Sequence, residues 1–331
     1  MTTTVEPSLG SPGPGGLTLR PATPADLPAC ERIWRAGLMG YLGPMGLGDI
    51  PEENPGLRRL HAHTLATDPS RFWVAEQAAG TPLAFGSAVL RGPVWFLSML
   101  FVNPEVQAKG VGRAILDRIL PPAADGVILS TVTDSAQPIS NGLYASLGIV
   151  PRSPLFGFIG RPRDGWAPPP LPEGIRAVPV IGPHGVPSGE LGARVEPSDG
   201  PFAAERDALD REVLGFDHPA DHAFAANADE RRFAYRDQTG RLAGYGAASL
   251  AGRVGPVAVR DQALLAPVLG HLLSVVQPRG ASSIWVPGAA GEAIRLVLEA
   301  GIRIDGFPVL VGWSAPFVDL ARYLPFSPGL L

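Results

Sequence analysis

The segment LFVNPEVQAKGVGRAILDRIL, residues 100–120, predicts a strand, a glycine-containing turn and a helix in direct succession. An apolar run ends at Asn103-Pro104, and an amphipathic pattern begins around Gly110 and Gly112. A helix that begins at such a turn directs several free backbone N–H groups and the positive end of its dipole toward one point. Glycines let a bulky ligand approach the backbone. The segment therefore predicts an anion-binding site suited to phosphate.

Two common phosphate-binding motifs do not fit this turn. A P-loop requires G-x-x-x-x-G-K-[ST], which the segment lacks. A dinucleotide-binding fingerprint requires G-x-G-x-x-G after the first strand of its unit, but Ile115 stands in place of the third glycine and the turn comes late in its unit. The pattern V-x-x-x-x-Q/R-x-x-G-x-G/A does fit, with Val102, Gln107, Gly110 and Gly112.

This pattern resembles the coenzyme-A-binding motif of the GNAT superfamily of acyl-CoA-dependent N-acyltransferases, and the resemblance covers residues 17–160. The later run QPISNGLYASLGI is similar to the family's N-P-x-x-x-x-x-Y-x-x-x-G-F motif. In this chain Gln137 replaces the asparagine and Ile149 replaces the phenylalanine. The alternative is an unrelated α/β ligand-binding domain. Two motifs at the expected separation and in the expected order favour the GNAT interpretation.

The resemblance implies a role for each motif residue. The pantetheine arm of acetyl-CoA would bond to the backbone at the end of the strand, and the amides of the turn would hold the pyrophosphate. Tyr144 would be the general acid that protonates the departing thiolate, although a core aromatic residue is the alternative for this position. The coenzyme-A-binding residues implied are Leu100, Phe101, Val102, Gln107, Ala108, Lys109, Gly110, Val111, Gly112, Arg113 and Gln137.

The sequence departs from the family pattern at the general base. Many relatives carry a carboxylate three or four residues before the matching valine, but Met99 and Ser98 occupy these positions. Asp134 and Asp49 are substitutes without supporting spacing. We expect an enzyme that transfers acetyl directly, in a ternary complex, to a primary amine of a small molecule or peptide. The alternative is a non-catalytic acyl-CoA-binding sensor: the missing carboxylate favours the sensor and Tyr144 favours the enzyme.

Patterns along the chain predict a mixed α/β fold of two tandem GNAT-like domains, each a central mixed sheet flanked by helices. Residues 1–16 are rich in proline and glycine and predict a disordered tail. Residues 17–160 form the expected catalytic domain. Residues 161–173 form a stiff, proline-rich linker. Residues 174–331 form the second domain.

The second domain repeats segments of the first in the same order, which indicates an ancient duplication. The matching pairs are 72–88 with 233–249, 101–120 with 257–273, and 143–160 with 296–313. The second domain has lost the motif residues: the glutamine, the two glycines and the tyrosine align with Leu264, Pro267, Leu269 and Val297. We therefore expect a single acetyl-CoA per chain. The second domain would brace the first, complete the acceptor pocket or form the interface of a homodimer.

Composition argues against several other classes of protein. The net charge of −4 gives no electrostatic reason to expect nucleic acid or an anionic membrane as a partner. No run approaches the ~18 apolar residues of a membrane span, and the N-terminus lacks a signal-peptide pattern. The lone cysteine, Cys30, excludes an internal disulfide, is expected to be buried, and suits a reducing, cytoplasmic location.

Histidine spacing gives no metal site. His61 and His63 project in different directions from a helix, so they cannot share a ligand. His218 and His222 could lie on one helix face, but zinc would need a third ligand and none has supporting spacing. We expect the second pair to be solvated at the surface and no metal to be bound.

The irregular segment 40–56 is expected to shape the acceptor pocket, because the superfamily places acceptor-binding elements after the first helix. Its carboxylates would suit a cationic amine; they belong to Asp49, Glu52 and Glu53.

Overall fold

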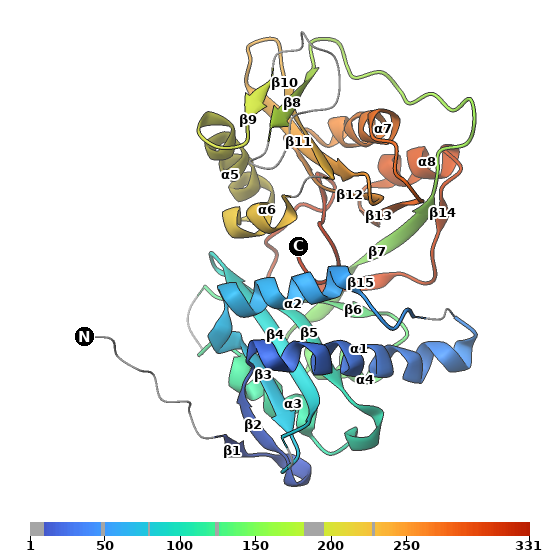
Figure 1. Ribbon diagram of the computed structural model, residues 1–331. Coiled ribbons are helices and arrows are strands. Elements are labelled where there is room, and N and C mark those ends of the chain that lie inside the picture. Colours follow the sequence, from blue (N-terminus) through green and yellow to red (C-terminus); the bar gives the residue numbers. More distant parts are fainter. Residues whose placement is uncertain (1–9, 48–49, 79, 123–125, 182–194, 227–228) are drawn as a thin grey trace. The chain divides into compact units, whose positions relative to one another are not determined.

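The computed structural model describes residues 10–47, 50–78, 80–122, 126–181, 195–226 and 229–331. They pack as two compact units. Unit 1 contains the chain up to Leu90 together with Trp95–Leu129, and unit 2 contains Arg91–Val94 and Ser130–Leu331. Each unit combines a sheet with covering helices, which confirms the predicted mixed α/β fold (Figure 1).

The sheet of unit 1 follows the strand order β1-β2-β3-β4-β5. Helices cover both of its faces. Phe85 of β4 packs on His61 of α2, with ring centroids 5.1 Å apart. A Cβ on the next residue, Gly86, would lie 2.6 Å from Cγ2 of Ile115 on α3, so this glycine lets α3 lie close to the opposite face. The bounds are β1 (Ser11–Pro12), β2 (Thr18–Pro21), β3 (Phe72–Glu76), β4 (Pro82–Arg91), β5 (Val94–Val102), α1 (Leu27–Leu42), α2 (Pro55–Thr67) and α3 (Val111–Ile119).

The N-terminal segment differs from the disordered tail expected over residues 1–16. Ser11 and Pro12 pair with β2 at the edge of the sheet, and a 3-10 turn, η1 (Pro14–Gly16), follows. A proline is tolerated there because an edge strand leaves one row of N–H groups unpaired. Residues 1–9, the rest of the expected tail, lie outside the described residues.

The sheet of unit 2 follows the order β6-β15-β7-β13-β12-β11-β10-β8-β9, and β14 and β16 pair with β7 and β12. Its strands are β6 (Ile128–Asp134, in this unit from Ser130), β7 (Val150–Gly160), β8 (Arg176–Ile181), β9 (Glu196–Pro197), β10 (Glu230–Arg236), β11 (Leu242–Ser249), β12 (Arg253–Val259), β13 (Ser282–Pro287), β14 (Arg303–Ile304), β15 (Val309–Trp313) and β16 (Tyr323–Leu324). Its helices are α4 (Pro138–Ala145), α5 (Pro201–Leu214), α6 (Pro219–Ala225), α7 (Leu265–Val275) and α8 (Gly291–Glu299). Around β11, helices α5 and α7 cover opposite faces, since Tyr245 bonds to Asp210 of α5 whereas a Cβ on Gly246 would meet Leu272 of α7.

The predicted duplication is visible in the order of elements. The series β2-α1-α2-β3-β4-β5-α3-β6-α4-β7 recurs as β8-α5-α6-β10-β11-β12-α7-β13-α8-β15, with β9 and β14 as additions. The two series correspond helix for helix and strand for strand, which confirms a tandem arrangement.

The last strands of the two series are exchanged. Strand β15 lies between β6 and β7, with Val311 opposite Val132 on one side and Ser153 on the other. Strand β7 in turn pairs with β13, with Gly157 opposite Trp285. The packing therefore divides the chain at Ser130, before the boundary at residues 161–173 that the sequence repeats indicate.

The proline-rich linker packs along unit 2. Trp166 and Leu171 pack against its main hydrophobic core, and the guanidinium of Arg161 donates to the carbonyls of Gly280 and Arg279 at 2.7 and 2.6 Å. The segment contains no helix or strand, as its composition predicts.

Candidate active site

The turn between β5 and α3 folds back on the end of the strand. The Asn103 side chain accepts a hydrogen bond from the Glu105 N–H at 3.1 Å and so begins the 3-10 turn η5 (Pro104–Val106). The Gln107 side chain then donates from Nε2 to the carbonyl oxygen of Val102 at 3.0 Å. Gln107 thereby fixes the start of the loop against the strand that precedes it.

Two left-handed residues shape the loop. Gly110, the N-cap of α3, has φ 76°, and Ala108 has φ 63°. Among the described residues, Ala108 is the sole non-glycine with a positive φ. This conformation costs an alanine about 1–2 kcal/mol, and it recurs at functional sites that the surrounding structure holds in place. Left-handed residues turn successive N–H groups into a concave anion-binding arrangement, here at the start of a helix.

The two glycines of the motif serve different purposes. A Cβ on Gly110 would meet only Cγ of Pro14, at 3.9 Å, so the positive φ is what favours glycine there. A Cβ on Gly112 would face the strand, 3.6 Å from Val102 and 3.8 Å from Leu100, which is ordinary contact. The expectation that glycine opens the way to a ligand therefore applies to Gly110 and not to Gly112.

The end of β5 presents alternating side chains. Met99 and Phe101 pack against the core beneath α1, whereas Leu100 and Val102 lie toward α3. Ser98 and Met99 occupy the positions where many relatives carry the general base, so no carboxylate stands there. Ser98 is buried. Asp134 is partly committed elsewhere, because its Oδ1 accepts the Ala136 N–H at 3.0 Å.

Gln137 and Tyr144 belong to unit 2, whereas the loop residues belong to unit 1. Gln137 is the N-cap of α4, and its carbonyl oxygen accepts from the Asn141 side chain at 2.8 Å. Tyr144 lies near the end of α4 and is 6% exposed. Burial raises the pKa of its hydroxyl well above the usual value, so the phenol stays protonated throughout the neutral range.

The segment 40–56, expected to be irregular and to shape the acceptor pocket, is partly helical. Helix α1 extends into it as far as Leu42, a 3-10 turn, η3 (Gly43–Met45), follows, and α2 begins at Pro55. Glu52 and Glu53 are exposed, and Asp49 lies outside the described residues. The buried Glu31 of α1 holds the start of α2, because it accepts the Asn54 N–H at 2.6 Å and pairs with Arg58 at 3.0 Å. The position of this segment is therefore fixed at its end.

Cys30 is buried in the core beneath α1, as expected, and burial raises the pKa of its thiol to about 12. None of the described helices combines the length and the apolar character that crossing a membrane requires.

The second domain lacks the loop. Its 3-10 turn η6 (Gln262–Leu264) runs directly into α7. The structure therefore has no loop equivalent to Gln107–Gly110, although the sequence repeats align Gln107 and Gly110 with Leu264 and Pro267. Leu269 and Val297, aligned with Gly112 and Tyr144, are fully buried in the core. These observations support the expectation that this domain does not bind coenzyme A.

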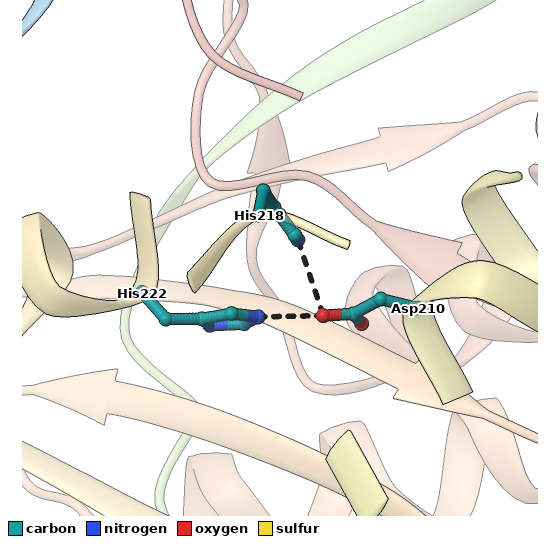
Figure 2. Close-up of side chains that lie close together, drawn as sticks. All are labelled: Asp210, His218 and His222. Atoms are coloured by element: carbon teal, nitrogen blue, oxygen red, sulfur yellow. Dashed lines mark hydrogen bonds and ion pairs between the residues drawn. The ribbon is translucent and has the colours of Figure 1, made fainter. Parts of the chain in front are cut away.

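A polar cluster in unit 2 corrects one expectation from the sequence. His218 and His222 are not a solvated pair: they are 2% and 5% exposed, and both face Asp210 of α5 (Figure 2). Asp210 is fully buried because it lies on the inward stripe of α5 with Phe202, Leu209 and Val213. A charged residue within an apolar helical stripe was the signal in the sequence that could have pointed to this cluster.

Electrostatics link the members of this cluster. Burial disfavours the charged carboxylate of Asp210, but the contacts with His218 and His222 outweigh that effect and hold its pKa well below the usual range. Burial also lowers the pKa of His218, but the neighbouring carboxylates outweigh it and raise the value to about 9. For His222, burial and the positive charge of His218 lower the pKa to about 3.

Residues 68–149 match the family described as Acetyltransferase (GNAT) domain. This part of the chain belongs to the GNAT family. The match includes β5, the loop, α3 and Tyr144. No curated protein gave a significant match to the chain.

Solved structures with the same fold include a tandem GNAT protein. A protein of Pyrococcus horikoshii assigned as an acetyltransferase is 14% identical, with a TM-score of 0.70 and coverage of 99% of this chain and 100% of that one. A GCN5-related N-acetyltransferase from Sphaerobacter thermophilus is 17% identical, with a TM-score of 0.56 and coverage of 93% and 99%. A tandem GNAT protein from the clavulanic acid biosynthesis pathway is 14% identical, with a TM-score of 0.52 and coverage of 91% and 99%. At these identities the likeness establishes the shared tandem GNAT fold.

Proposed function

We propose that the chain is an acetyl-CoA-dependent N-acetyltransferase that acetylates a primary amine of a small molecule or peptide. The observation that carries the proposal is the loop at the start of α3. It has the GNAT motif in sequence, and Ala108 and Gly110 adopt the left-handed conformation that an anion-binding loop requires.

In this proposal the donor is held chiefly by backbone groups. The amides from Ala108 to Arg113 bind the pyrophosphate, and the backbone of Leu100–Val102 binds the pantetheine arm. The residues present fit these roles, because the first N–H groups of α3 have no partners within the helix. The side chain of Gln107 is already bonded to the Val102 carbonyl, so it supports the loop and leaves the anion to the amides.

The proposed chemical step is direct attack of the acceptor nitrogen on the acetyl carbonyl carbon. A C–N bond forms, the C–S bond breaks, and the sulfur takes a proton from the hydroxyl of Tyr144. The nitrogen loses one proton to water, and Tyr144 regains its proton from solvent. This role for Tyr144 rests on its match to the family motif. Its raised pKa supports the role, since an acid must hold its proton until the thiolate leaves.

No carboxylate stands at Ser98 or Met99 to accept the proton of an ammonium group. The proposed acceptor is therefore an amine of low pKa, whose neutral form attacks without the help of a strong base. The carboxylates of Glu52, Glu53 and Asp49 would attract the protonated, cationic form of such an amine to the region between α1 and α2.

A non-catalytic acyl-CoA sensor is the second candidate, and the absence of a carboxylate on β5 favours it. A thiol-release assay with acetyl-CoA and a panel of amino acids, polyamines, aminoglycosides and peptide N-termini separates the two. The enzyme releases coenzyme A with at least one acceptor class. Tight acetyl-CoA binding with no release across the whole panel would instead identify a sensor. We further propose a cytoplasmic location, because the lone cysteine suits a reducing compartment.

A further inference from the structure

We propose that Asp210, His218 and His222 form a zinc-binding site in unit 2. The site is separate from the proposed acetyl transfer, since its residues come from α5, from α6 and from the N-cap of α6. Two imidazole nitrogens and a carboxylate oxygen are a donor set that zinc uses with a further ligand or water in the fourth position.

The donor atoms already converge. Nε2 of His222 lies 2.8 Å and Nε2 of His218 lies 3.4 Å from the same carboxylate oxygen, Oδ2 of Asp210 (Figure 2). The donor atoms all lie within 4.8 Å of one another. In a tetrahedral site with bonds of about 2.0–2.1 Å, neighbouring ligand atoms are about 3.3 Å apart. The two contacts with Asp210 therefore already lie within about 0.5 Å of this spacing.

His218 is the strongest sign that something is bound here. Its side chain is 2% exposed, and its ring nitrogens make only long ion-pair contacts, with Asp210 at 3.4 Å and Asp221 at 3.6 Å, and no well-formed hydrogen bond to any described residue. Buried polar groups are hydrogen-bonded in the great majority of cases, and an exception calls for a missing ion or water. Its ring is directed toward Asp210, as Figure 2 shows, so a metal at that point would satisfy it.

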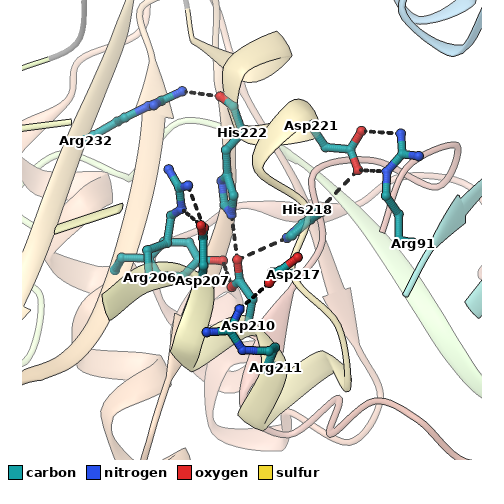
Figure 3. Close-up of polar contacts among 11 residues, drawn as sticks. Arg91, Arg206, Asp207, Asp210, Arg211, Asp217, His218, Asp221, His222 and Arg232 are labelled. Carbon is teal, nitrogen blue, oxygen red and sulfur yellow. Dashed lines mark hydrogen bonds and ion pairs between the residues drawn. The ribbon is translucent and has the colours of Figure 1, made fainter. Parts of the chain in front are cut away.

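The surrounding residues resemble the outer shell of a metal site. Tyr245 donates its hydroxyl proton to the other oxygen of Asp210, Oδ1, at 2.6 Å. Nδ1 of His218 faces the carboxylate of Asp221 at 3.6 Å, and Arg91 holds that carboxylate with two hydrogen bonds of 2.8 and 2.9 Å (Figure 3). Metal-bound histidines commonly direct their second nitrogen at a carboxylate, which fixes the ring orientation.

A small pocket adjoins the site. It has room for about one water molecule and is lined by His222, Tyr245 and Phe233 among others. Its arginines are engaged, since Arg206 pairs with Asp207 at 2.6 Å and Arg232 pairs with Glu230 at 2.7 Å. The pocket can therefore supply the water for the fourth position.

The competing explanation is a hydrogen-bonded cluster in which a proton on histidine balances Asp210. The distance of 2.8 Å between His222 and Asp210 would suit either arrangement. A proton leaves no metal in the purified protein and no dependence on added zinc, so metal content distinguishes the two.

The first test is elemental analysis of the full-length chain, as purified and after treatment with a chelator followed by Zn²⁺ and gel filtration. We expect one zinc per chain after reloading, and a thermal midpoint that rises with added Zn²⁺. Replacement of zinc by Co²⁺ should give the visible absorption of a low-symmetry, nitrogen- and oxygen-bound cobalt ion. Failure to take up zinc, or preferential loading with iron(II) from an equimolar mixture, would overturn the zinc assignment.

The second test uses ligand variants and a matched histidine control. His218→Gln, His222→Gln and Asp210→Asn should each weaken zinc binding at least ~100-fold, the upper end of the loss caused by outer-shell changes alone. Asp221→Asn should weaken it ~10–100-fold with stoichiometry kept. His63→Gln, on helix α2, should bind zinc as the wild type does. Far-UV circular dichroism checks folding, and zinc binding unchanged in the folded ligand variants would refute the site.

Discussion

His61 is a buried histidine that the fold keeps neutral. It is fully buried between Phe72 and Phe85, and neither ring nitrogen has a hydrogen-bond partner among the described residues. Burial lowers its pKa to about 4, and the nearby carboxylate of Glu31 offsets only part of that effect. An unsatisfied buried polar group costs about 1–3 kcal/mol, so His61 makes unit 1 less stable than an apolar residue would.

The lowered pKa of His61 predicts acid-sensitive stability. Because the unfolded chain binds a proton near pH 6.5 and the folded chain only near pH 4, stability is complete above pH 6.5 and is lost as pH falls toward 4. Between pH 7 and pH 5 this residue should remove about 2 kcal/mol of unfolding free energy. Urea unfolding at both pH values should show that loss in the wild type and its absence in His61→Leu. His63→Leu is the control, and an equal pH dependence in His61→Leu would contradict the assignment.

Tyr144 is the residue on which the proposed chemistry depends most. Tyr144→Phe removes only the hydroxyl, so acetyl-CoA affinity should stay nearly constant while kcat falls by roughly 10²-fold, the lower end of general-acid effects. Steady-state kinetics with the acceptor found by thiol release, combined with calorimetry, measures both quantities. Normal turnover by the variant would show that Tyr144 is not the general acid and that it serves as an aromatic residue of the core.

The sequence identified single residues best where a role depends on local spacing. Gln107 and Gly110 could be found because the motif, the turn and the helix start lie within one short segment. His218 and His222 could not be assigned correctly, because their burial depends on Asp210 from another helix. Likewise, nothing in the spacing indicated that the missing side chain of Gly112 faces β5.

At the scale of elements, the segment formed by β5, the loop and α3 is proposed to bind the pyrophosphate through its backbone N–H groups, so binding should depend on the charge of nearby side chains. Gly110 is left-handed, and both Asn and Asp tolerate that conformation better than other non-glycine residues. Gly110→Asn and Gly110→Asp therefore form a matched pair that differs in one negative charge. The Asp variant should bind acetyl-CoA about fivefold or more weakly than the Asn variant, since two like charges a few ångströms apart repel by about 1 kcal/mol or more. Equal affinities of the two variants for acetyl-CoA in calorimetry would show that this loop does not bind the phosphate.

The segment between α1 and α2 provides a test of acceptor binding. Asp49→Asn, Glu52→Gln and Glu53→Gln together remove its negative charge with little change in size. If the acceptor is a cationic amine that this segment attracts, its KM should rise several-fold, and should rise less at high salt, while the KM of acetyl-CoA stays constant. An unchanged acceptor KM would place acceptor recognition elsewhere.

Element positions can be predicted well where an apolar run is bounded by turns. The sequence patterns at 71–77, 83–90 and 94–102 indicate strands, and the structure has β3, β4 and β5 there. Thr23 and Pro24 have the sequence pattern of an N-cap and a first helical residue. The structure instead forms a 3-10 turn there, η2 (Pro24–Asp26), held by hydrogen bonds from Thr23 to Asp26. The ends of helices depend on such side-chain contacts, which cannot be predicted from the periodicity of apolar residues.

The exchange of β7 and β15 depends on the whole molecule, and no local sequence pattern predicts it. Strands β7 and β15 are both rich in apolar residues, so their sequences do not indicate whether each pairs with β6 or with β13. The choice depends on packing across the chain. In the structure, β15 approaches β7 closely, since a Cβ on Gly312 would lie 3.1 Å from the carbonyl oxygen of Val150. The sequence repeats therefore identify the duplication correctly and leave the division into compact units undetermined.

The duplication raises the question of how many acetyl-CoA molecules one chain binds. The start of α3 in the first domain and the start of α7 in the second differ in three ways, and these differences predict a single acetyl-CoA per chain. In the second domain, α7 continues directly from η6 without a left-handed loop, and Pro267 within it has no N–H. The N–H of Ala263, the second residue of η6, is taken by the carboxylate of Asp261 at 2.9 Å, whereas the neutral Asn103 occupies the corresponding place at η5. A carboxylate there repels an incoming phosphate.

Isothermal titration of the full chain should therefore give a stoichiometry of one acetyl-CoA. Gly110→Asp should weaken that binding, whereas Gln262→Glu, which adds one negative charge at the corresponding helix start in the second domain, should leave stoichiometry and affinity unchanged. The pair distinguishes the two domains within the intact chain, with no need to separate them. Two binding events in the wild type, or a second event that Gln262→Glu removes, would mean that the second domain is a working site after all.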